Sequence, residues 1–159
     1  IYLDNAATTY PKPRSVYQAW SRAMTAYGAN PGRSGHAMSM AASRVSSLKT
    51  VRPQPQRLRE FFGAEPENTV FTLNCTHALN IAIKGLARPG AHFVLSDIEH
   101  NAVIRPVHSL TESGVRYTLF ESSSEPWQTV MNAARAIRPE TVALICTAAG
   151  NVTGQRMPL

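Results

Sequence analysis

The sequence predicts an α/β protein in which a mostly parallel β-sheet carries helices on both faces. From about residue 70 onward, short apolar runs alternate with longer runs whose apolar residues recur every three or four positions. Apolar strands that alternate with helices are typical of parallel sheets covered on both faces. The expected strands are Val70–Thr72, His92–Ser96, Val115–Phe120 and Thr141–Thr147, and the expected helices are Thr76–Leu86, Asn101–Leu110 and Trp127–Ile137.

The chain before this alternation is predicted to be mainly helical. Apolar residues at helical spacing predict helices over residues 14–27, Ser39–Val45 and Gln56–Phe62. The breaker residues of segment 28–32 end the first of them. The stretch Ser46–Gln56 holds two prolines, which cannot continue a regular helix because each removes a backbone donor.

Length and composition indicate a globular protein. The 159 residues suffice for one domain or for part of a larger one, and 43% are hydrophobic and 16% charged. No apolar stretch is long enough to cross a bilayer, and no secretory signal is visible, so we expect a cytoplasmic protein without a membrane partner. The two cysteines, Cys75 and Cys146, show no metal-ligand spacing, which favours a reducing compartment and no metal site.

The net charge of +6 raises nucleic-acid binding as an alternative. The arginines are scattered along the chain, however, and no dense basic run is present. We therefore expect no nucleic-acid partner and keep this function as a distant alternative.

The loops that follow the strands are the expected ligand-binding region, because ligands of such sheets bind beyond the carboxyl ends of the strands. Thr76 stands where a strand gives way to a helix, and a helix N-terminus suits a phosphate group. The alternative is that Thr76 is an ordinary N-cap, which is common at this position.

Two further polar residues follow strands. His100 could stack on a planar ring or move a proton, and the alternative is a surface or capping histidine. Asn151 could hydrogen-bond a ligand oxygen, and the alternative is an ordinary turn residue. The residues alone therefore indicate a doubly wound domain with a phosphate site and no more.

Five segments carry a resemblance to a known family. They are Tyr2–Thr9 with Pro11–Pro13, Asn30–His36, Phe71–Asn80, Glu99–Ala102 and Asn151–Gly154. In this order they resemble segments of the cysteine desulfurases, class V aminotransferases that use pyridoxal phosphate, and they span nearly the whole chain. The resemblance implies part of the large domain of a fold-type I pyridoxal-phosphate transferase, preceded by an N-terminal arm and helix. Residues 1–30 would be that arm and helix, and residues 31–159 the first part of the cofactor-binding domain.

The resemblance also implies roles for individual residues. Thr76 and the backbone at Cys75 would hold the cofactor phosphate, and His100 would stack on the pyridine ring and help to move protons. Asn151 would hydrogen-bond the phenolic oxygen of the cofactor. The substrate side would be lined by Asn5, Ala6, Ala7, Thr8 and Asn30.

The implied activity is the conversion of L-cysteine to L-alanine, with the sulfur passed to an enzyme cysteine as a persulfide. The cofactor would act as the electron sink. The parent protein would be a homodimer that can deliver sulfur to an acceptor protein. The alternatives are another class V activity, such as a selenocysteine lyase or an aminotransferase, and a non-catalytic binding or dimerising remnant.

Several family residues have no match in this sequence. None of the three lysines, Lys12, Lys49 and Lys84, stands at the position of the lysine that holds the cofactor, so we expect the chain to be inactive alone. Neither cysteine matches the persulfide position, and both are expected to be small packed residues. The Ser46–Gln56 stretch is longer than its family counterpart. Ala148 and Gly150 replace a histidine and a serine that are often found in the family just before Asn151, so the surroundings of Asn151 in the cofactor site would differ from those in the family.

Overall fold

The computed structural model describes residues 1–2, 8–32, 35–46, 61–65, 68–70 and 72–158. The chain divides into two compact units, Ile1–Phe71 and Thr72–Leu159, and each is described by itself. The division expected at residue 30 concerns the domains of the parent protein and stays a prediction.

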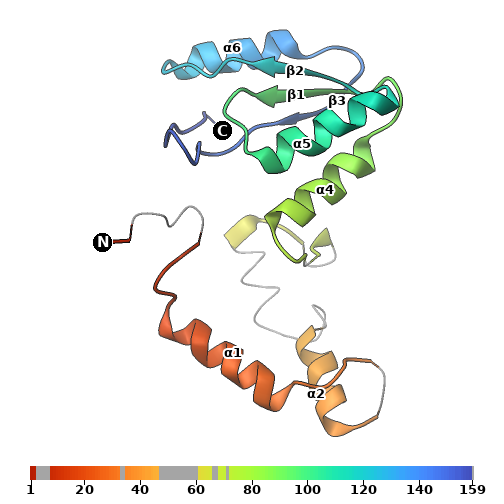
Figure 1. The fold of residues 1–159 in the computed structure, drawn as a ribbon, viewed down its shortest axis with the longest axis vertical. Coiled ribbons are helices and arrows are strands. Elements are labelled where there is room, and N and C mark those ends of the chain that lie inside the picture. The colour runs from red at the N-terminus through yellow and green to blue at the C-terminus, as the bar shows by residue number, and fades with distance from the viewer. Residues whose placement is uncertain (3–7, 33–34, 47–60, 66–67, 71, 159) are drawn as a thin grey trace. The chain divides into compact units, whose positions relative to one another are not determined.

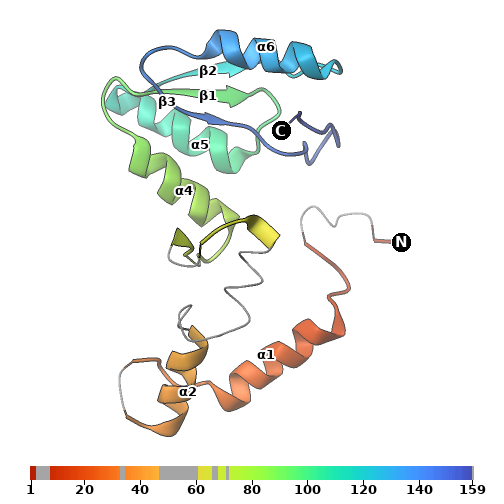
Figure 2. The ribbon, with the colours of Figure 1, turned by 180° about the vertical axis from the view of Figure 1, so that it is seen from behind.

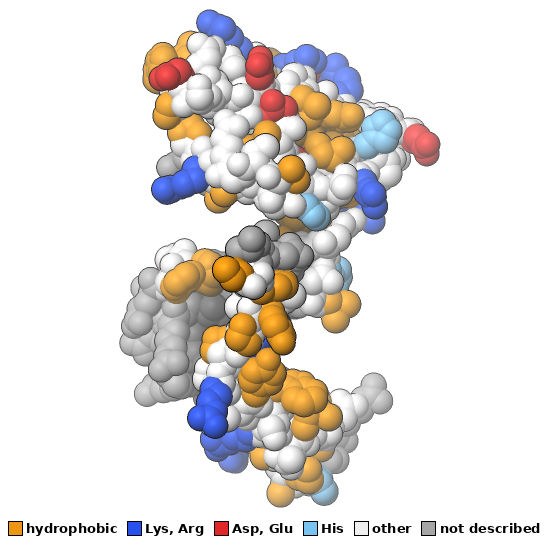
Figure 3. Space-filling view, turned by 60° about the vertical axis from the view of Figure 1, so that its left-hand side comes forward, with side chains coloured by type: hydrophobic (Ala, Val, Ile, Leu, Met, Phe, Trp, Pro, Cys, Tyr) orange, Lys and Arg blue, Asp and Glu red, His pale blue; other side chains and the backbone are white. Residues whose placement is uncertain are grey.

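The described residues of the first unit include the helices α1 (Arg14–Ala26) and α2 (Ala37–Ser46), which confirms the helices predicted over residues 14–27 and Ser39–Val45. Of the helix predicted over Gln56–Phe62, the structure describes only its last two residues, and both are helical. The Ser46–Gln56 stretch lies outside the described residues after Ser46. No residue of α1 is buried, and hydrophobic side chains lie at the surface of both units (Figure 3).

The second unit is built on a three-stranded sheet of order β2-β1-β3, in which both strand pairs are parallel (Figure 1). Each strand and helix lies within two residues of its predicted bounds, so the predicted fold class is confirmed. In chain order the elements are α4 (Cys75–Leu86), β1 (His92–Ser96), α5 (Asn101–Ser109), the 3₁₀ helix η2 (Leu110–Ser113), β2 (Arg116–Phe120), α6 (Pro126–Ala136) and β3 (Thr141–Ile145).

The strand order explains why helices cover both faces. The chain leaves β1 through α5 to reach β2 on one side, and then returns through α6 to β3 on the other side of β1. When two crossover connections have the same handedness but run in opposite directions across a sheet, their helices lie on opposite faces of that sheet. Accordingly α5, with α4 packed against it, lies on one face and α6 on the other (Figures 1 and 2).

The core of this unit is centred on β1, all five residues of which are buried. Successive side chains of a strand point to opposite faces. Phe93 and Leu95 pack toward α4 and α5, and Val94 packs toward α6. The buried partners on the first face are Ile83, Val103, Val107 and Val115, and those on the second are Phe120 and Met157.

The strand predicted at Val70–Thr72 is not formed by the two of its residues that the structure describes. Val70 and Thr72 belong to no strand, and Phe71 between them lies outside the described residues. The Val70 side chain is 75% exposed, so its apolar character does not reflect packing on a sheet. Among the described residues, no helix combines the length and the apolar character needed to cross a membrane.

Candidate functional site

A cavity of about 380 Å³ opens at the carboxyl ends of β1 and β3. α5, which follows β1, and α6, which precedes β3, lie on opposite faces of the sheet. In open α/β sheets this arrangement leaves a crevice for a ligand between the two strands. The cavity brings together Cys75, Thr76 and His100, which the sequence predicted as site residues. Its lining is Cys75, Thr76, Leu79, Glu99, His100, Ala102, Val103, Ile145, Cys146 and Thr147.

The first turn of α4 forms one side of the cavity. Asn74 is the N-cap: its Oδ1 accepts a hydrogen bond from the His77 amide at 2.9 Å, and its carbonyl accepts one from Ala78 at 3.1 Å. Thr76 is the second residue of the helix, so the alternative in which Thr76 is the cap is wrong. Among the described residues no acceptor reaches the amides of Cys75 and Thr76, which leaves two donors for an anion.

His100 is the N-cap of α5. Its Nδ1 accepts a hydrogen bond from the Ala102 amide at 3.0 Å, so the proton of the neutral ring lies on Nε2. The ring is exposed and lines the cavity. The capping interpretation is thus confirmed, and the same geometry leaves Nε2–H available to a ligand. Stacking on a cofactor ring stays a prediction.

Glu99 is a cavity residue that sequence reasoning missed as a site residue. Its Oε1 accepts a hydrogen bond from Ser96 Oγ at 2.7 Å and another from the Thr147 amide at 2.5 Å. The carboxylate therefore connects the ends of β1 and β3. A charged residue directly before His100, in a loop at the carboxyl edge of the sheet, was the available signal.

The two cysteines of the cavity differ in environment. Cys146 is partly buried, and desolvation, followed by the charge of Glu99, raises the pKa of its thiol. Cys75 is exposed, so the expectation that it is packed is wrong, because the first turn of α4 opens onto the cavity. Within the described part of the chain, no three His, Cys, Asp or Glu side chains gather in a way that could hold a metal.

Asn151 lies on an exposed turn after β3 and is not among the residues that line this cavity. The turn is held by hydrogen bonds from the Gly150 amide to the Gln155 carbonyl (2.9 Å) and from the Gly154 amide to the Gly150 carbonyl (2.8 Å). A Cβ atom at Gly150 would lie 2.7 Å from Thr153 Oγ1, which is a physical reason for glycine there. The contact of Asn151 with a cofactor stays a prediction.

The predicted substrate-side residues belong to the first unit. Thr8 Oγ1 accepts a hydrogen bond from Lys12 Nζ at 3.0 Å, and the Asn30 carbonyl accepts one from Ser39 Oγ at 2.5 Å. The segment Asn5–Ala7 lies outside the described residues. Their role toward a substrate therefore stays a prediction.

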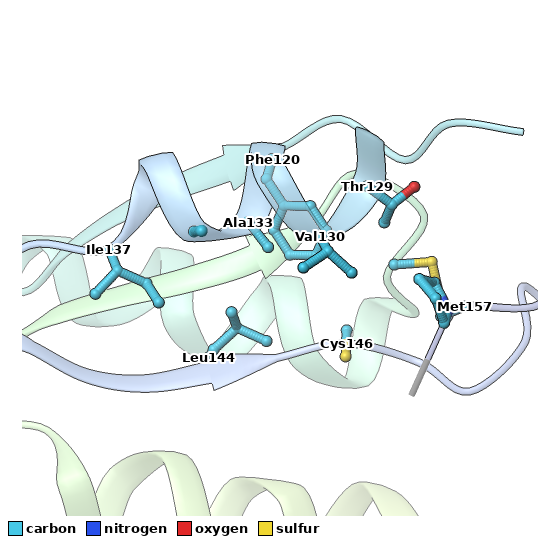
Figure 4. A pocket seen from close by; sticks show the side chains of 10 residues that line it. Phe120, Thr129, Val130, Ala133, Ile137, Leu144, Cys146 and Met157 are labelled. Carbon is cyan, nitrogen blue, oxygen red and sulfur yellow. The ribbon is translucent and has the colours of Figure 1, made fainter. Parts of the chain in front are cut away.

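Two other hollows flank the cavity. A polar groove of about 480 Å³ between α4 and α5 shares Thr76 and His100 with it and is also lined by Lys84 and Arg105. On the opposite face, a cavity of about 280 Å³ lies between α6 and β3, and its lining carries no charged side chain (Figure 4). Of these three hollows in the described part of the chain, the cavity at the strand ends alone combines a helix N-terminus, an imidazole and a carboxylate.

A family model described as aminotransferase class-V matches residues 1–159. The chain belongs to the class V aminotransferase family. A curated relative, the cysteine desulfurase IscS of Dictyoglomus turgidum, is 28% identical over 100% of this chain, which spans 40% of the length of that relative.

Solved structures share the fold of this class V chain. The protein SspA, in complex with cysteine, superposes with a TM-score of 0.79 and 28% identity, covering 99% of this chain and 44% of its own. A C-DES mutant with glycine covalently linked to its PLP cofactor superposes with a TM-score of 0.72 and 24% identity, covering 92% of this chain and 38% of its own. The match to the second structure shows the fold alone.

Proposed function

We propose that this class V chain supplies one wall of the cofactor site of a pyridoxal-phosphate-dependent cysteine desulfurase, which converts L-cysteine to L-alanine and passes the sulfur to an enzyme cysteine as a persulfide. The observation that carries the proposal is the cavity at the ends of β1 and β3. It is lined by the imidazole of His100 and by Cys75 and Thr76, whose amides meet no acceptor among the described residues. The chain spans about 40% of the curated relative, so this is a proposal about the whole protein.

The cavity fits the cofactor in its hydrogen-bond donors and in its size. Pyridoxal phosphate joins a phosphate dianion to a planar ring, and the amides of Cys75 and Thr76 with the Thr76 hydroxyl suit the phosphate. The exposed ring of His100 suits the planar part. The volume of about 380 Å³ lies within the ordinary range of small-molecule sites, roughly 300–1,000 Å³.

The bound cofactor would supply an electron sink for carbanion chemistry. The residues of this chain would hold the cofactor and transfer protons to and from the substrate. His100 is suited to the second task because its Nδ1 is engaged by the Ala102 amide, which leaves Nε2 as the atom that gives or takes a proton. The partly buried side chains of Leu79 and Ile145 limit water on one side.

The remaining parts of the proposal concern partners and compartment. L-cysteine is the proposed substrate because the SspA structure was obtained in complex with cysteine. We also propose a homodimer, a protein that accepts the sulfur, and a reducing cytoplasmic compartment. Support for the compartment comes from Cys75 and Cys146, which are both free thiols.

Cofactor binding is tested on this chain by calorimetric titration with 4′-deoxypyridoxine 5′-phosphate, an analogue without the aldehyde that would react with lysines. We expect the analogue to bind, and 4′-deoxypyridoxine without the phosphate to bind far more weakly. Thr76→Val should weaken binding about tenfold, the value of one hydrogen bond to a charged group. Thr111→Val is the matched control, because Thr111 lies in η2, after α5, and its hydroxyl donates a hydrogen bond to the His108 carbonyl, away from the cavity. Equal binding with and without phosphate would contradict the proposal.

The reaction is tested on the reading frame that contains this sequence, expressed in full. With pyridoxal phosphate, a thiol reductant and L-cysteine, we expect sulfide and alanine in equal amounts. Activity on L-selenocysteine alone, or transfer of the amino group to a keto acid without sulfide, would replace this proposal by another class V activity. His100→Ala should lower kcat by about 10² or more, the ordinary contribution of a general acid–base group.

A further inference from the structure

We infer that Glu99 is a positioning residue for the cavity: one carboxylate oxygen joins the carboxyl ends of β1 and β3 and thereby fixes the loop that presents His100. The part of this inference that concerns cofactor binding rests on the proposed function. The part that concerns the two strands stands on the hydrogen bonds of Glu99 alone.

The contacts of Glu99 lie where the pairing of the two strands ends. The last paired residues of β1 and β3 are Leu95 and Ile145. Beyond them, Glu99 Oε1 accepts hydrogen bonds from the fully buried Ser96, at Oγ, and from the amide of Thr147. The carboxylate thus connects the two strands just beyond their last backbone hydrogen bonds. Hydrogen bonds to an ionised acceptor are stronger than those between neutral groups.

The same loop has a second anchor on the other side of β1. The Asp97 amide donates to the Phe120 carbonyl at 3.0 Å, and Asp97 Oδ1 accepts a hydrogen bond from the Ser122 amide at 3.0 Å. The loop is therefore tied to β2 through Asp97 and to β3 through Glu99. His100 follows Glu99 directly, and Asp97 does not line the cavity. Asp97 thus offers a matched control with the same kind of carboxylate bond.

Glu99 also places negative charge in the cavity. Its carboxylate and the Cys146 thiol line the same space, and that charge acts together with desolvation to keep the thiol protonated. Replacing the carboxylate by an amide removes the charge and keeps an oxygen that can accept both hydrogen bonds. The bonding role and the charge are therefore separable by experiment.

The experiment compares Glu99→Ala, Glu99→Gln and Asp97→Ala in this chain by three measurements. These are the Thr147 amide proton shift, the pH dependence of Cys146 alkylation by iodoacetamide, and the affinity for 4′-deoxypyridoxine 5′-phosphate. Glu99→Ala should move the Thr147 amide upfield. It should lower the affinity for the analogue about tenfold or more, because it removes both charge-assisted hydrogen bonds that fix the loop before His100. Glu99→Gln should largely restore the affinity but shift Cys146 alkylation to lower pH. Asp97→Ala should leave the Thr147 amide and Cys146 near their original values, and it should lower the affinity less than Glu99→Ala does, because Asp97 does not line the cavity.

Two results would overturn the inference. One is a Thr147 amide that does not move in Glu99→Ala, and the other is an equal loss of affinity in Asp97→Ala and Glu99→Ala. If the unsubstituted chain does not bind the analogue, the proposed function fails, while the Thr147 and Cys146 measurements still test Glu99. If Glu99→Ala does not fold, Glu99→Gln still decides, because unaltered Cys146 alkylation in that variant would contradict the placement of the charge.

Discussion

His92 Nε2 lies 2.9 Å from Thr118 Oγ1, so the ring of the central strand reaches the hydroxyl of its neighbour β2. On its other side, Nδ1 lies 2.8 Å from Thr141 Oγ1 of β3. One imidazole therefore connects all three strands at the amino end of the sheet. The ring is fully buried, and desolvation, followed by the nearby charge of Arg138, lowers the pKa of His92.

The lowered pKa of His92 predicts that acid destabilises the second unit. In the unfolded chain a histidine takes up a proton below its ordinary pKa of about 6.5, whereas folded His92 resists protonation. The stabilisation is therefore fully present above that value, and it is lost as the pH falls from there through the folded pKa. Urea unfolding at pH 7.5, 6.5 and 5.5 should show this loss. His92→Gln should flatten the dependence, and His108→Gln, at an exposed histidine, should not.

Two isoleucines of α4 allow the contribution of the core to be measured with a matched pair. Ile83 is 1% exposed and belongs to the cluster around Phe93, whereas Ile81 is 52% exposed. Ile83→Val should lower the free energy of unfolding by about 1 kcal/mol, because it removes one buried methylene group. Ile81→Val should change it by much less. Equal effects in urea unfolding would show that α4 does not pack on the sheet as described.

The elements of the second unit were predictable because each has a strong local pattern. The run His92–Ser96 is bounded by breakers and coincides with β1, and the helix predicted over Trp127–Ile137 differs from α6 by one residue at each end. The strand predicted at Val70–Thr72 rested on three residues. So short a run carries little periodicity, and the exposure of Val70 shows how it misleads.

The site was predictable only in part. Cys75, Thr76 and His100 meet in one cavity because α4 packs against α5 and the first turns of both helices line it. The role of Glu99 depends on the pairing of β1 with β3, two strands separated by more than forty residues, and no local pattern reports that pairing. The choice of Asn74 rather than Thr76 as the cap likewise depends on where the helix begins.

The lysines provide a test of covalent cofactor chemistry in this chain. Lys12 donates hydrogen bonds to Thr8 and Thr9, and Lys84 lines the polar groove between α4 and α5 rather than the cavity at the strand ends. Lys49 lies outside the described residues. We expect no specific lysine adduct when pyridoxal phosphate is added, reduced with borohydride and mapped by mass spectrometry. A stoichiometric adduct on Lys84 or Lys49, together with sulfide release from cysteine, would contradict this expectation.

The exposed edge of the sheet predicts self-association of the chain. In the described sheet β3 is an edge strand, and its Leu144 side chain is 40% exposed at the apolar cavity beside α6 (Figure 4). An unpaired strand edge next to apolar surface favours pairing with another copy, and a charge on the edge opposes it. Sedimentation velocity should show concentration-dependent association that Leu144→Lys reduces. Val152→Lys is the control, since Val152 is 90% exposed on the turn after β3. A monodisperse monomer at all concentrations, or equal effects of the two substitutions, would show that association does not use this edge.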